Sequence, residues 1–307
     1  MNQDPISDIL RLADVESVVS GGFTAGGEWA IRFPAPDKLK FFASIRGSCG
    51  LQIEGEPRAF RIEPGDVLLL TAARAFTMAS HPAVTPVDAP TVFEGRTSPI
   101  VELGGGQDIL LIGGHVRLDP AYAPMLAEAL PPLVHVRAST PEARFMRWIL
   151  DSLVEESRSD QPGSGLAMTQ LAHLLFVHIL RAHLSVEGPL KAGWLRVAAD
   201  RRLAPALRLM HGAPGKPWRL DQLAQATAMS RTLFASHFKV VAGIAPLTYL
   251  AHWRMRLAQH ALRRGDVPVT TLARDLGYAS ESAFSHAFKR IVGVSPSRYG
   301  HPVKGGR

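Results

Sequence analysis

The C-terminal third of this 307-residue chain carries an internal repeat with a period of 50 residues. Phe234 and Phe238 in the first copy match Phe284 and Phe288 in the second. Each copy continues with lysine, glycine, proline and tyrosine at equal spacing. Because each copy is only roughly 30 residues long, the repeat predicts two similar small helical modules.

Each copy has the pattern of a helix, a tight turn and a second helix. In the first copy, the first helix is expected over residues 220–227, and Ser230 is placed to cap the second helix. In the second copy, the first helix is expected over residues 269–276, Gly277 provides the backbone freedom of the turn, and Ser280 is the cap. Both second helices end at a glycine, with a proline three residues later. The sequence therefore predicts two helix-turn-helix units.

The segment between the two units, residues 246–262, is compatible with one long helix. At ~1.5 Å per residue this helix spans about 25 Å. It could hold the two second helices one DNA turn apart, ~34 Å, on the same face of a duplex. A single chain would then read two consecutive major grooves.

The second helix of each unit has an apolar face and an outward face. The residues expected in the core are Leu233, Phe234, Phe238 and Val241 in the first unit, and Ala283, Phe284, Ala287, Phe288 and Ile291 in the second. The outward residues, which we expect to bind DNA, are Arg231, Thr232, Ala235, Ser236 and Lys239 in the first unit, and Glu281, Ser282, Ser285, His286, Lys289 and Arg290 in the second.

The charge of the chain is unevenly distributed. Residues 201–307 contain 17 Lys and Arg against four Asp and Glu, a net charge of +13, whereas residues 1–200 have a net charge of −6. This asymmetry favours a C-terminal domain that binds a polyanion. The alternative, that the outward faces are merely solvated, is weakened by the repeat.

The repeated region resembles the AraC/XylS-type DNA-binding domain. The resemblance covers residues 218–299 through SRTLFASHFKVVAGIAPLTYL, RMRLAQHAL and LARDLGYASESAFSHAFKRIVGVSPSRY. It implies a seven-helix domain that binds double-stranded promoter DNA. It also implies base-facing positions, which are Thr232, Ala235 and Ser236 in the first unit and Glu281, Ser282, Ser285 and His286 in the second. Many relatives have longer polar side chains in the first unit, so we expect that unit to position the protein and the second to read bases more directly.

Residues 26–116 have the pattern of short β-strands. Segments rich in Ile, Phe, Val and Leu alternate with Gly, Pro and Asp turns, among them the turn at residues 63–66. This spacing predicts a small antiparallel barrel or jelly roll. The segments APDKLKFFASIRGSCGLQIEG and FRIEPGDVLLL also resemble the cupin-like N-terminal domain of one branch of AraC-type regulators.

The expected barrel lacks the groups that catalysis would need. Cupin oxygenases hold a metal with two or three histidines and a carboxylate. Between residues 39 and 100 the sequence has a single histidine, His81, and it has neither a His-x-His pair nor a Gly-x-Ser-x-Gly motif. We therefore expect no enzyme activity, no metal and no cofactor.

A barrel without catalytic groups can still hold a small effector molecule. The candidate lining residues are Trp29, Arg32, Phe42, Arg46 and His81. An inward Arg32 or Arg46 would favour an anionic effector. The alternative for each residue is an ordinary place in the core or on the surface. Cys49 is expected to be a packed small residue rather than a redox sensor.

Two helices are expected after the strands, over residues 140–157 and 165–184. The second helix is apolar on most of its surface, yet it contains three histidines and Arg181, which argues against a membrane span. Such a helix packs in its own domain or against a partner. The family resemblance implies dimerisation through such helices, so we expect a homodimer. Residues 187–200 are expected to connect the domains.

The sequence thus predicts an α+β multidomain protein with three regions. These are a cupin-like, effector-binding region over 1–120, a helical dimerisation and linker region over 121–200, and the tandem helix-turn-helix domain over 201–307. The expected function is sequence-specific transcription regulation under the control of a small-molecule effector, with RNA polymerase as a partner if the protein is an activator. The alternatives are an effector-independent architectural DNA-binding protein, or a cupin enzyme fused to a DNA-binding module with a metal at His81.

The expected location of the protein is the cytoplasm, in association with the nucleoid. One cysteine, Cys49, suits a reducing compartment. The acidic, amphipathic N-terminus lacks the basic and apolar segments of a secretory signal.

Overall fold

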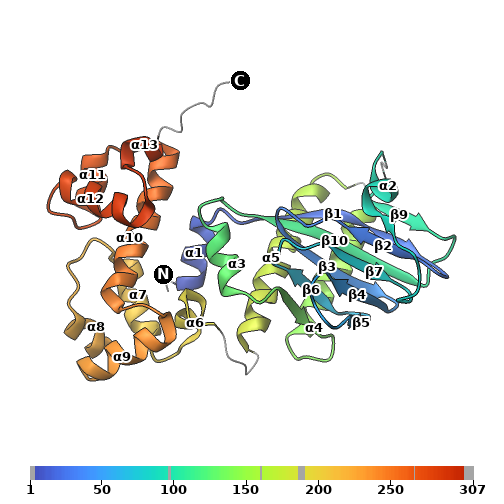
Figure 1. The fold of residues 1–307 in the computed structure, drawn as a ribbon, viewed down its shortest axis with the longest axis horizontal. Coiled ribbons are helices and arrows are strands. Elements are labelled where there is room, and N and C mark those ends of the chain that lie inside the picture. Colours follow the sequence, from blue (N-terminus) through green and yellow to red (C-terminus); the bar gives the residue numbers. More distant parts are fainter. Residues whose placement is uncertain (1–3, 96–97, 160, 186–190, 266, 301–307) are drawn as a thin grey trace. The chain divides into compact units, whose positions relative to one another are not determined.

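The structure, a computed structural model, describes residues 4–95, 98–159, 161–185, 191–265 and 267–300 (Figure 1). The chain forms two compact units. The sheet unit is Asp14–Pro189, and the helical unit combines Met1–Ala13 with Leu190–Arg307. These units are divided differently from the three predicted regions, whose functional roles stay predictions.

The sheet unit contains two β-sheets. The first has the strand order β11-β6-β3-β10-β1-β9 and the second has the order β5-β4-β7-β2-β8. The bounds of the strands are β1 Glu16–Ala25, β2 Ala30–Phe33, β3 Leu39–Arg46, β4 Cys49–Ile53, β5 Phe60–Ile62, β6 Val67–Leu70, β7 Phe76–Ala79, β8 Val87–Asp88, β9 Ile100–Leu103, β10 Ile109–Arg117 and β11 Leu133–Val136. The pairings β1–β9 and β2–β8 are parallel and the others are antiparallel.

The two sheets face each other across an aromatic core, and they do not close into a barrel. Phe42 from the first sheet contacts Phe33 and Phe76 from the second, with ring centroids 5.9 and 5.3 Å apart. Along β4, the side chains of Cys49, Leu51 and Ile53 alternate into this core. The jelly-roll form of the prediction is therefore the correct one, and the closed barrel is wrong.

A buried carboxylate fixes the predicted turn at residues 63–66. Asp66 accepts hydrogen bonds from the backbone N–H of Glu63 at 3.0 Å and of Ala138 at 2.8 Å. Its carboxylate also lies 2.8 Å from Nε2 of His135 on β11. Since a buried charge is costly without partners, this network secures the β6–β11 edge of the sheet.

The sheet unit also contains four helices, α2 Ala89–Phe93, α3 Ala123–Ala129, α4 Ala143–Arg158 and α5 Ser164–Ser185. The helix α2 contacts the second sheet at β2 and β8, whereas α4 and α5 pack on each other and on the first sheet. By length and hydropathy α5 could cross a membrane, so its polar residues are not enough to exclude a span. It packs on α4, β1, β6 and β11, and a third of its most apolar stretch is buried.

The helical unit holds the repeat. Its helices are α1 Pro5–Leu12, α6 Trp194–Ala199, α7 Ala204–Gly212, α8 Leu220–Ala226, α9 Arg231–Ala242, α10 Pro246–Arg264, α11 Val269–Asp275, α12 Glu281–Val292 and α13 Pro296–Gly300. Within the described part of residues 201–300, the seven helices α7–α13 match the number that the family resemblance implies.

The helix α1 packs on the helical unit, although the sequence pattern placed it with the strands. It contacts α6, α7 and α10. Ile9 and Leu10 are buried, and the carboxylate of Asp8 lies 3.4 Å from Nδ1 of His211 on α7. The imidazole of His211 stacks on Trp253 of α10 with ring centroids 3.7 Å apart. The start of the chain is thus part of the scaffold that supports the first helix-turn-helix unit.

Candidate nucleic-acid interface

The first helix-turn-helix unit consists of α8 and α9. Between the helices, Ala228 adopts a left-handed backbone conformation with φ +53°. The hydroxyl of Ser230 then accepts a hydrogen bond from the backbone N–H of Leu233 at 3.2 Å, which confirms the predicted cap. Gly243 ends α9 with φ +79°. The predicted order of helix, turn and helix is confirmed.

The second unit, α11 and α12, repeats this geometry. The hydroxyl of Ser280 accepts from the backbone N–H of Ala283 at 3.1 Å. Gly277 has φ +78°, and a Cβ placed there would lie 2.0 Å from the carbonyl oxygen of Gly215. This turn therefore requires glycine both for its backbone angle and for the close approach of the loop between α7 and α8.

Two features fix the second unit relative to the first. The helix α10 joins them as one continuous 19-residue helix. Arg254 of α10 donates from Nε to the carbonyl oxygen of Pro214 at 2.7 Å and from Nη2 to that of Lys216 at 2.9 Å. Its guanidinium also lies over the ring of Tyr278, 5.7 Å from the centroid. The arginine thus ties the α7–α8 loop to the turn of the second unit.

The helices α9 and α12 bury the same repeat positions. Phe234 and Phe238 are fully buried, as are Phe284 and Phe288. Leu233 was predicted in the core but is 47% exposed, and its counterpart Ala283 is exposed too. Both predictions are wrong because the core stripe runs through positions four residues apart, and these residues precede it by one position, about 100° around the helix.

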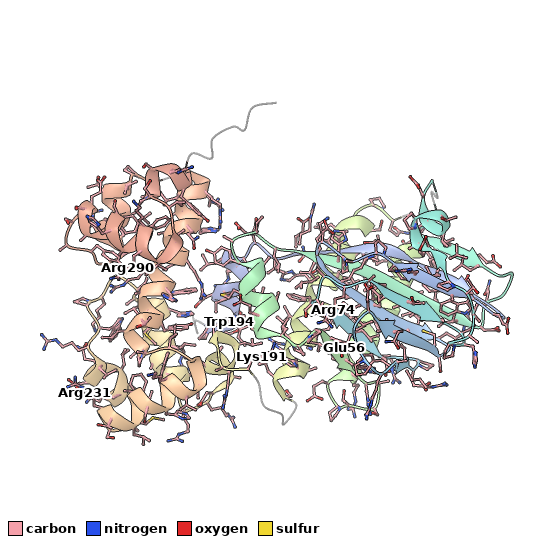
Figure 2. The ribbon with its side chains drawn as sticks, in the orientation of Figure 1. Glu56, Arg74, Lys191, Trp194, Arg231 and Arg290 are labelled. Carbon is pink, nitrogen blue, oxygen red and sulfur yellow. The ribbon has the colours of Figure 1, made fainter. Side chains whose placement is uncertain are left out.

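The outward faces match the predicted exposure at most positions. The exposed residues are Arg231, Thr232, Ser236, Lys239, Glu281, Ser282, His286, Lys289 and Arg290, and Ala235 and Ser285 are half-buried. Figure 2 shows the side chains of the helical unit, with Arg231 and Arg290 labelled. The contacts of these residues with DNA stay a prediction.

The five outward residues of α9 line one open groove of about 540 Å³, which the helix shares with Leu220 of α8 and with residues 245–247 at the start of α10. Arg231 at its edge lies 3.6 Å from Asp221 of α8. On α12, Glu281 accepts a hydrogen bond from the hydroxyl of Thr270 on α11. No sequence pattern signalled this contact, which holds the carboxylate against its own unit.

The sheet unit contains an inter-sheet cavity of about 370 Å³. Of the five predicted ligand-binding residues, Phe42 lines this cavity. Trp29 is buried and packs edge-on against Phe23, whose ring also lines the cavity, at 5.3 Å. Arg32, Arg46 and His81 are exposed and do not line it. Phe33, Phe93 and Lys40 do line it, and they were not predicted from the sequence.

Two further observations concern metal binding and the single cysteine. In the described part of the chain, no three His, Cys, Asp or Glu side chains gather into a potential metal site. Cys49 is buried, and burial raises the pKa of its thiol to about 12. At neutral pH this thiol is protonated and weakly nucleophilic.

Two family models match the chain. A model described as Cupin matches residues 4–185, more than half of the chain, and a model described as Helix-turn-helix domain matches residues 223–301. Both matches agree with the two folds described above.

The similar proteins include transcription regulators over nearly the whole length of the chain. An AraC-like transcription regulator of Streptomyces lividans is 40% identical over 301 residues, covering 98% of this chain and 99% of that protein. The HTH-type transcriptional regulator AlkR of Acinetobacter baylyi is 29% identical, covering 89% and 91%. The DNA-binding domain of AdpA, solved in complex with a target DNA, is 30% identical with a TM-score of 0.31, covering 32% of this chain and 89% of that one.

Proposed function

Because this chain belongs to the AraC-like transcription regulators, we propose that it binds one promoter site with both helix-turn-helix units, and that a small molecule in the inter-sheet cavity controls this binding. The supporting observation is the duplicated unit, in which α9 and α12 bury the same positions and are joined by the single helix α10. A rigid pair of reading helices suits two consecutive major grooves on one face of a duplex.

The outward residues divide into two roles. Four cationic side chains, Arg231, Lys239, Lys289 and Arg290, are exposed and suited to phosphate contacts. The short side chains of Thr232, Ala235 and Ser236 can offer a methyl contact or a weak hydrogen bond to a base edge.

On α12, Ser282, Ser285 and His286 are the proposed base readers. His286 and Ser282 are exposed near the start of the helix, where recognition helices contact bases. Glu281 is already bonded to Thr270, so its proposed role is to orient the start of α12. The second unit would therefore provide more of the sequence discrimination.

A footprint of the full-length protein on the DNA flanking its own coding region tests this proposal. We expect one protected site about two DNA turns long, whose affinity falls steeply with salt as bound cations are released. Equal protection of all sequences at moderate salt would contradict it.

Variants separate the two roles. Lys239→Gln and Lys289→Gln should weaken binding to every duplex to a similar degree, whereas Ser282→Ala and His286→Ala should each relax base preference by about 1–3 kcal/mol. Arg74→Gln, an exposed cation paired with Glu56 in the sheet unit (Figure 2), is the matched control and should change neither property. An equal decrease of specificity in both groups would contradict the assignment.

We also propose a homodimer formed through α4 and α5. Phe145 and Trp148 of α4 are 44% and 55% exposed, and Phe145 stacks near His178 of α5 with ring centroids 4.6 Å apart. Exposed aromatic side chains grouped on one face are typical of an interface. Trp148→Glu should yield a monomer in analytical ultracentrifugation, whereas Val87→Glu, at a separate exposed apolar residue, should leave the dimer intact. A wild-type monomer at micromolar concentration would exclude this interface.

We propose no catalytic activity for the protein, and its proposed cellular site is the nucleoid-associated cytoplasm. The relatives are transcription regulators, which supports the absence of an enzyme role. If footprinting places the site beside the polymerase-binding elements of a promoter, RNA polymerase is the expected partner and activation the expected outcome. A site overlapping the transcription start would indicate repression. The cavity argues against an architectural protein with a filled interior.

A further inference from the structure

The inter-sheet cavity combines an apolar wall with one inward cation. It is lined by β1, β3, β9 and β10 of the first sheet, by β2 of the second and by α2. Its aromatic residues are Phe23, Phe33, Phe42 and Phe93. Pockets of this size and composition bind small molecules through their apolar surface, and a few polar groups fix the orientation of the ligand.

Small residues in the wall maintain this space. Gly21 and Gly113 are cross-strand partners on β1 and β10, and Gly22 and Gly114 lie beside them. A Cβ on Gly113 would lie 3.0 Å from the Phe42 ring, which lines the cavity. Backbone instead of side chains therefore forms this part of the wall.

Lys40 is the cation. It lies two residues before Phe42 on β3, so both side chains point to the same inner face. Its Nζ lies 5.3 and 5.8 Å from the ring centroids of Phe33 and Phe42. Burial lowers the pKa of the Lys40 ammonium, because its charge has lost part of its hydration. Lys40 is half-buried, so its ammonium group can reach the cavity from the wall.

Asp37, three residues before Lys40, is close enough for its charge to oppose the lowering of the Lys40 pKa, but it does not line the cavity. None of the described residues that line it is Asp or Glu. The hydroxyls that line it, of Ser20 and Ser98, are already bonded to His115 and to the carbonyl oxygen of Ile100. A cationic ligand would be repelled, and a phosphate would need more donors than one ammonium provides.

We infer that the inter-sheet cavity binds a small hydrophobic carboxylate, whose apolar body packs among the four phenylalanines and whose anionic end pairs with Lys40. This inference rests on the proposed function, because it assigns a chemical class to the proposed effector. From the sequence, Arg32 and Arg46 were named as partners for an anion. Lys40 on β3 takes this role instead.

Isothermal titration calorimetry of the full-length protein without DNA tests the inference. The probes are benzoate, phenylacetate and octanoate, each with its neutral alcohol (benzyl alcohol, 2-phenylethanol and octanol). We expect at least one carboxylate to bind about tenfold or more tightly than its alcohol, because a charged pair adds to the apolar contacts. The aryl and alkyl acids distinguish an aromatic ligand from a fatty-acid-like one. Equal binding of acid and alcohol, or no binding of any acid at about 1 mM, would overturn the inference.

Variants at Lys40 test whether this residue is the cation that binds the carboxylate. Lys40→Met retains the length and apolar stem of the side chain, and should reduce the affinity for the acid about tenfold to that of the alcohol, while leaving alcohol binding unchanged. Lys40→Arg should retain the preference for the acid. Lys38→Met, at an exposed lysine beside Asp37, is the matched control and should behave as wild type. Unchanged acid binding in Lys40→Met, in a variant with a wild-type melting temperature, would contradict the role of Lys40.

The two experiments fail in distinguishable ways. Calorimetry measures the cavity alone, whereas the footprint measures promoter binding without any ligand. A protein that binds its promoter site but no carboxylate remains a regulator and overturns the ligand class. A protein that binds the acid at Lys40 but protects no site retains the ligand class and loses the proposed regulation.

Discussion

The two helix-turn-helix units are alike inside and different outside. Residues 231–240 and 281–290 have the same order of buried and exposed positions. Three exposed apolar residues of the first repeat copy, Leu233 and Val240 on α9 and Leu247 on α10, are replaced at the repeat positions by Ala283, Arg290 and Ser297. Packing therefore requires the same pattern of buried residues in both copies, whereas the exposed residues can differ in chemistry.

The repeat-equivalent tyrosines show the same divergence. Tyr249 is buried, and its hydroxyl lies 3.0 Å from Nε2 of His211. Tyr299 is half-buried, and its hydroxyl accepts hydrogen bonds from Gln259 and Arg263. The first unit is thus supported by additional helices, α1 among them, whereas the second is supported chiefly by α10 and its own helices.

The largest expected effect concerns the shared stripe. Phe238→Ala and Phe288→Ala should each lower the free energy of unfolding by about 3–5 kcal/mol, because each leaves a cavity in a closed core. Urea denaturation followed by tryptophan fluorescence measures this decrease. Leu233→Ala, at an exposed position, should cost no more than about 0.5 kcal/mol. If Phe288→Ala unfolded in two separate transitions, the two helix-turn-helix units would fold independently of each other.

A substitution at Arg254 tests whether the two helix-turn-helix units are held in a fixed relative position. Arg254→Met removes two charge-assisted hydrogen bonds to backbone carbonyls, so it should cost about 1.5–3 kcal/mol of stability. It should also blunt the preference for one spacing between half-sites in a binding assay with DNA containing inserted base pairs. Arg208→Met, at an exposed arginine of α7, is the control. Unaltered spacing preference would mean that α10 alone sets the geometry.

The buried His211 should make the free energy of unfolding of the helical unit depend on pH. Burial lowers the pKa of His211 to about 3, below its unfolded value of ~6.5, so protonation favours the unfolded state. The contribution of the neutral imidazole is complete above about pH 6.5 and falls by up to about 1.4 kcal/mol for each pH unit below it. Unfolding experiments at pH 7 and 5 measure the decline, which His211→Phe should reduce. A variant with the wild-type slope would assign the decline to other groups.

The smallest expected effect on stability is that of removing either helix cap. Ser230→Ala and Ser280→Ala should each cost about 1 kcal/mol, since each leaves a backbone N–H at the start of a recognition helix without its partner. Near-equal decreases of stability in thermal unfolding would support the equivalence of the two scaffolds. Ser297→Ala, which is exposed on α13, serves as the control.

The repeat made the helical unit predictable in detail. Its period identified the turns, the caps Ser230 and Ser280, and the buried phenylalanines, because these depend on local backbone geometry. The exposure of Leu233 was not predictable from composition, since a leucine beside the core stripe is the same residue type as one within it. The contact between Glu281 and Thr270 depends on how α11 and α12 pack, which periodicity does not encode.

The sequence predicted the strands of the sheet unit, but it predicted few of the residues that line the cavity. Short apolar segments indicated strands, but the face that a side chain occupies changes with a shift of one residue in register. Arg32 and Arg46 were therefore as eligible as Lys40 to point inward. Arg32 on β2 is exposed, and Arg46 lies past the irregularity between Leu110 and Leu111 in the β3–β10 pairing and is exposed too, so only Lys40 of the three lines the cavity. The packing of α1 also required tertiary information.

The place of α1 changes how this protein should be divided for engineering. Since residues 4–13 belong with α7 and α10, the sheet unit is an internal insert in the sequence of the DNA-binding unit. A chimaera that exchanges sensors should therefore swap residues 14–189 as a block and retain the native first helix. Exchange of everything before residue 190 would also remove the acid that faces His211, and would damage the recipient's DNA reader along with its sensor.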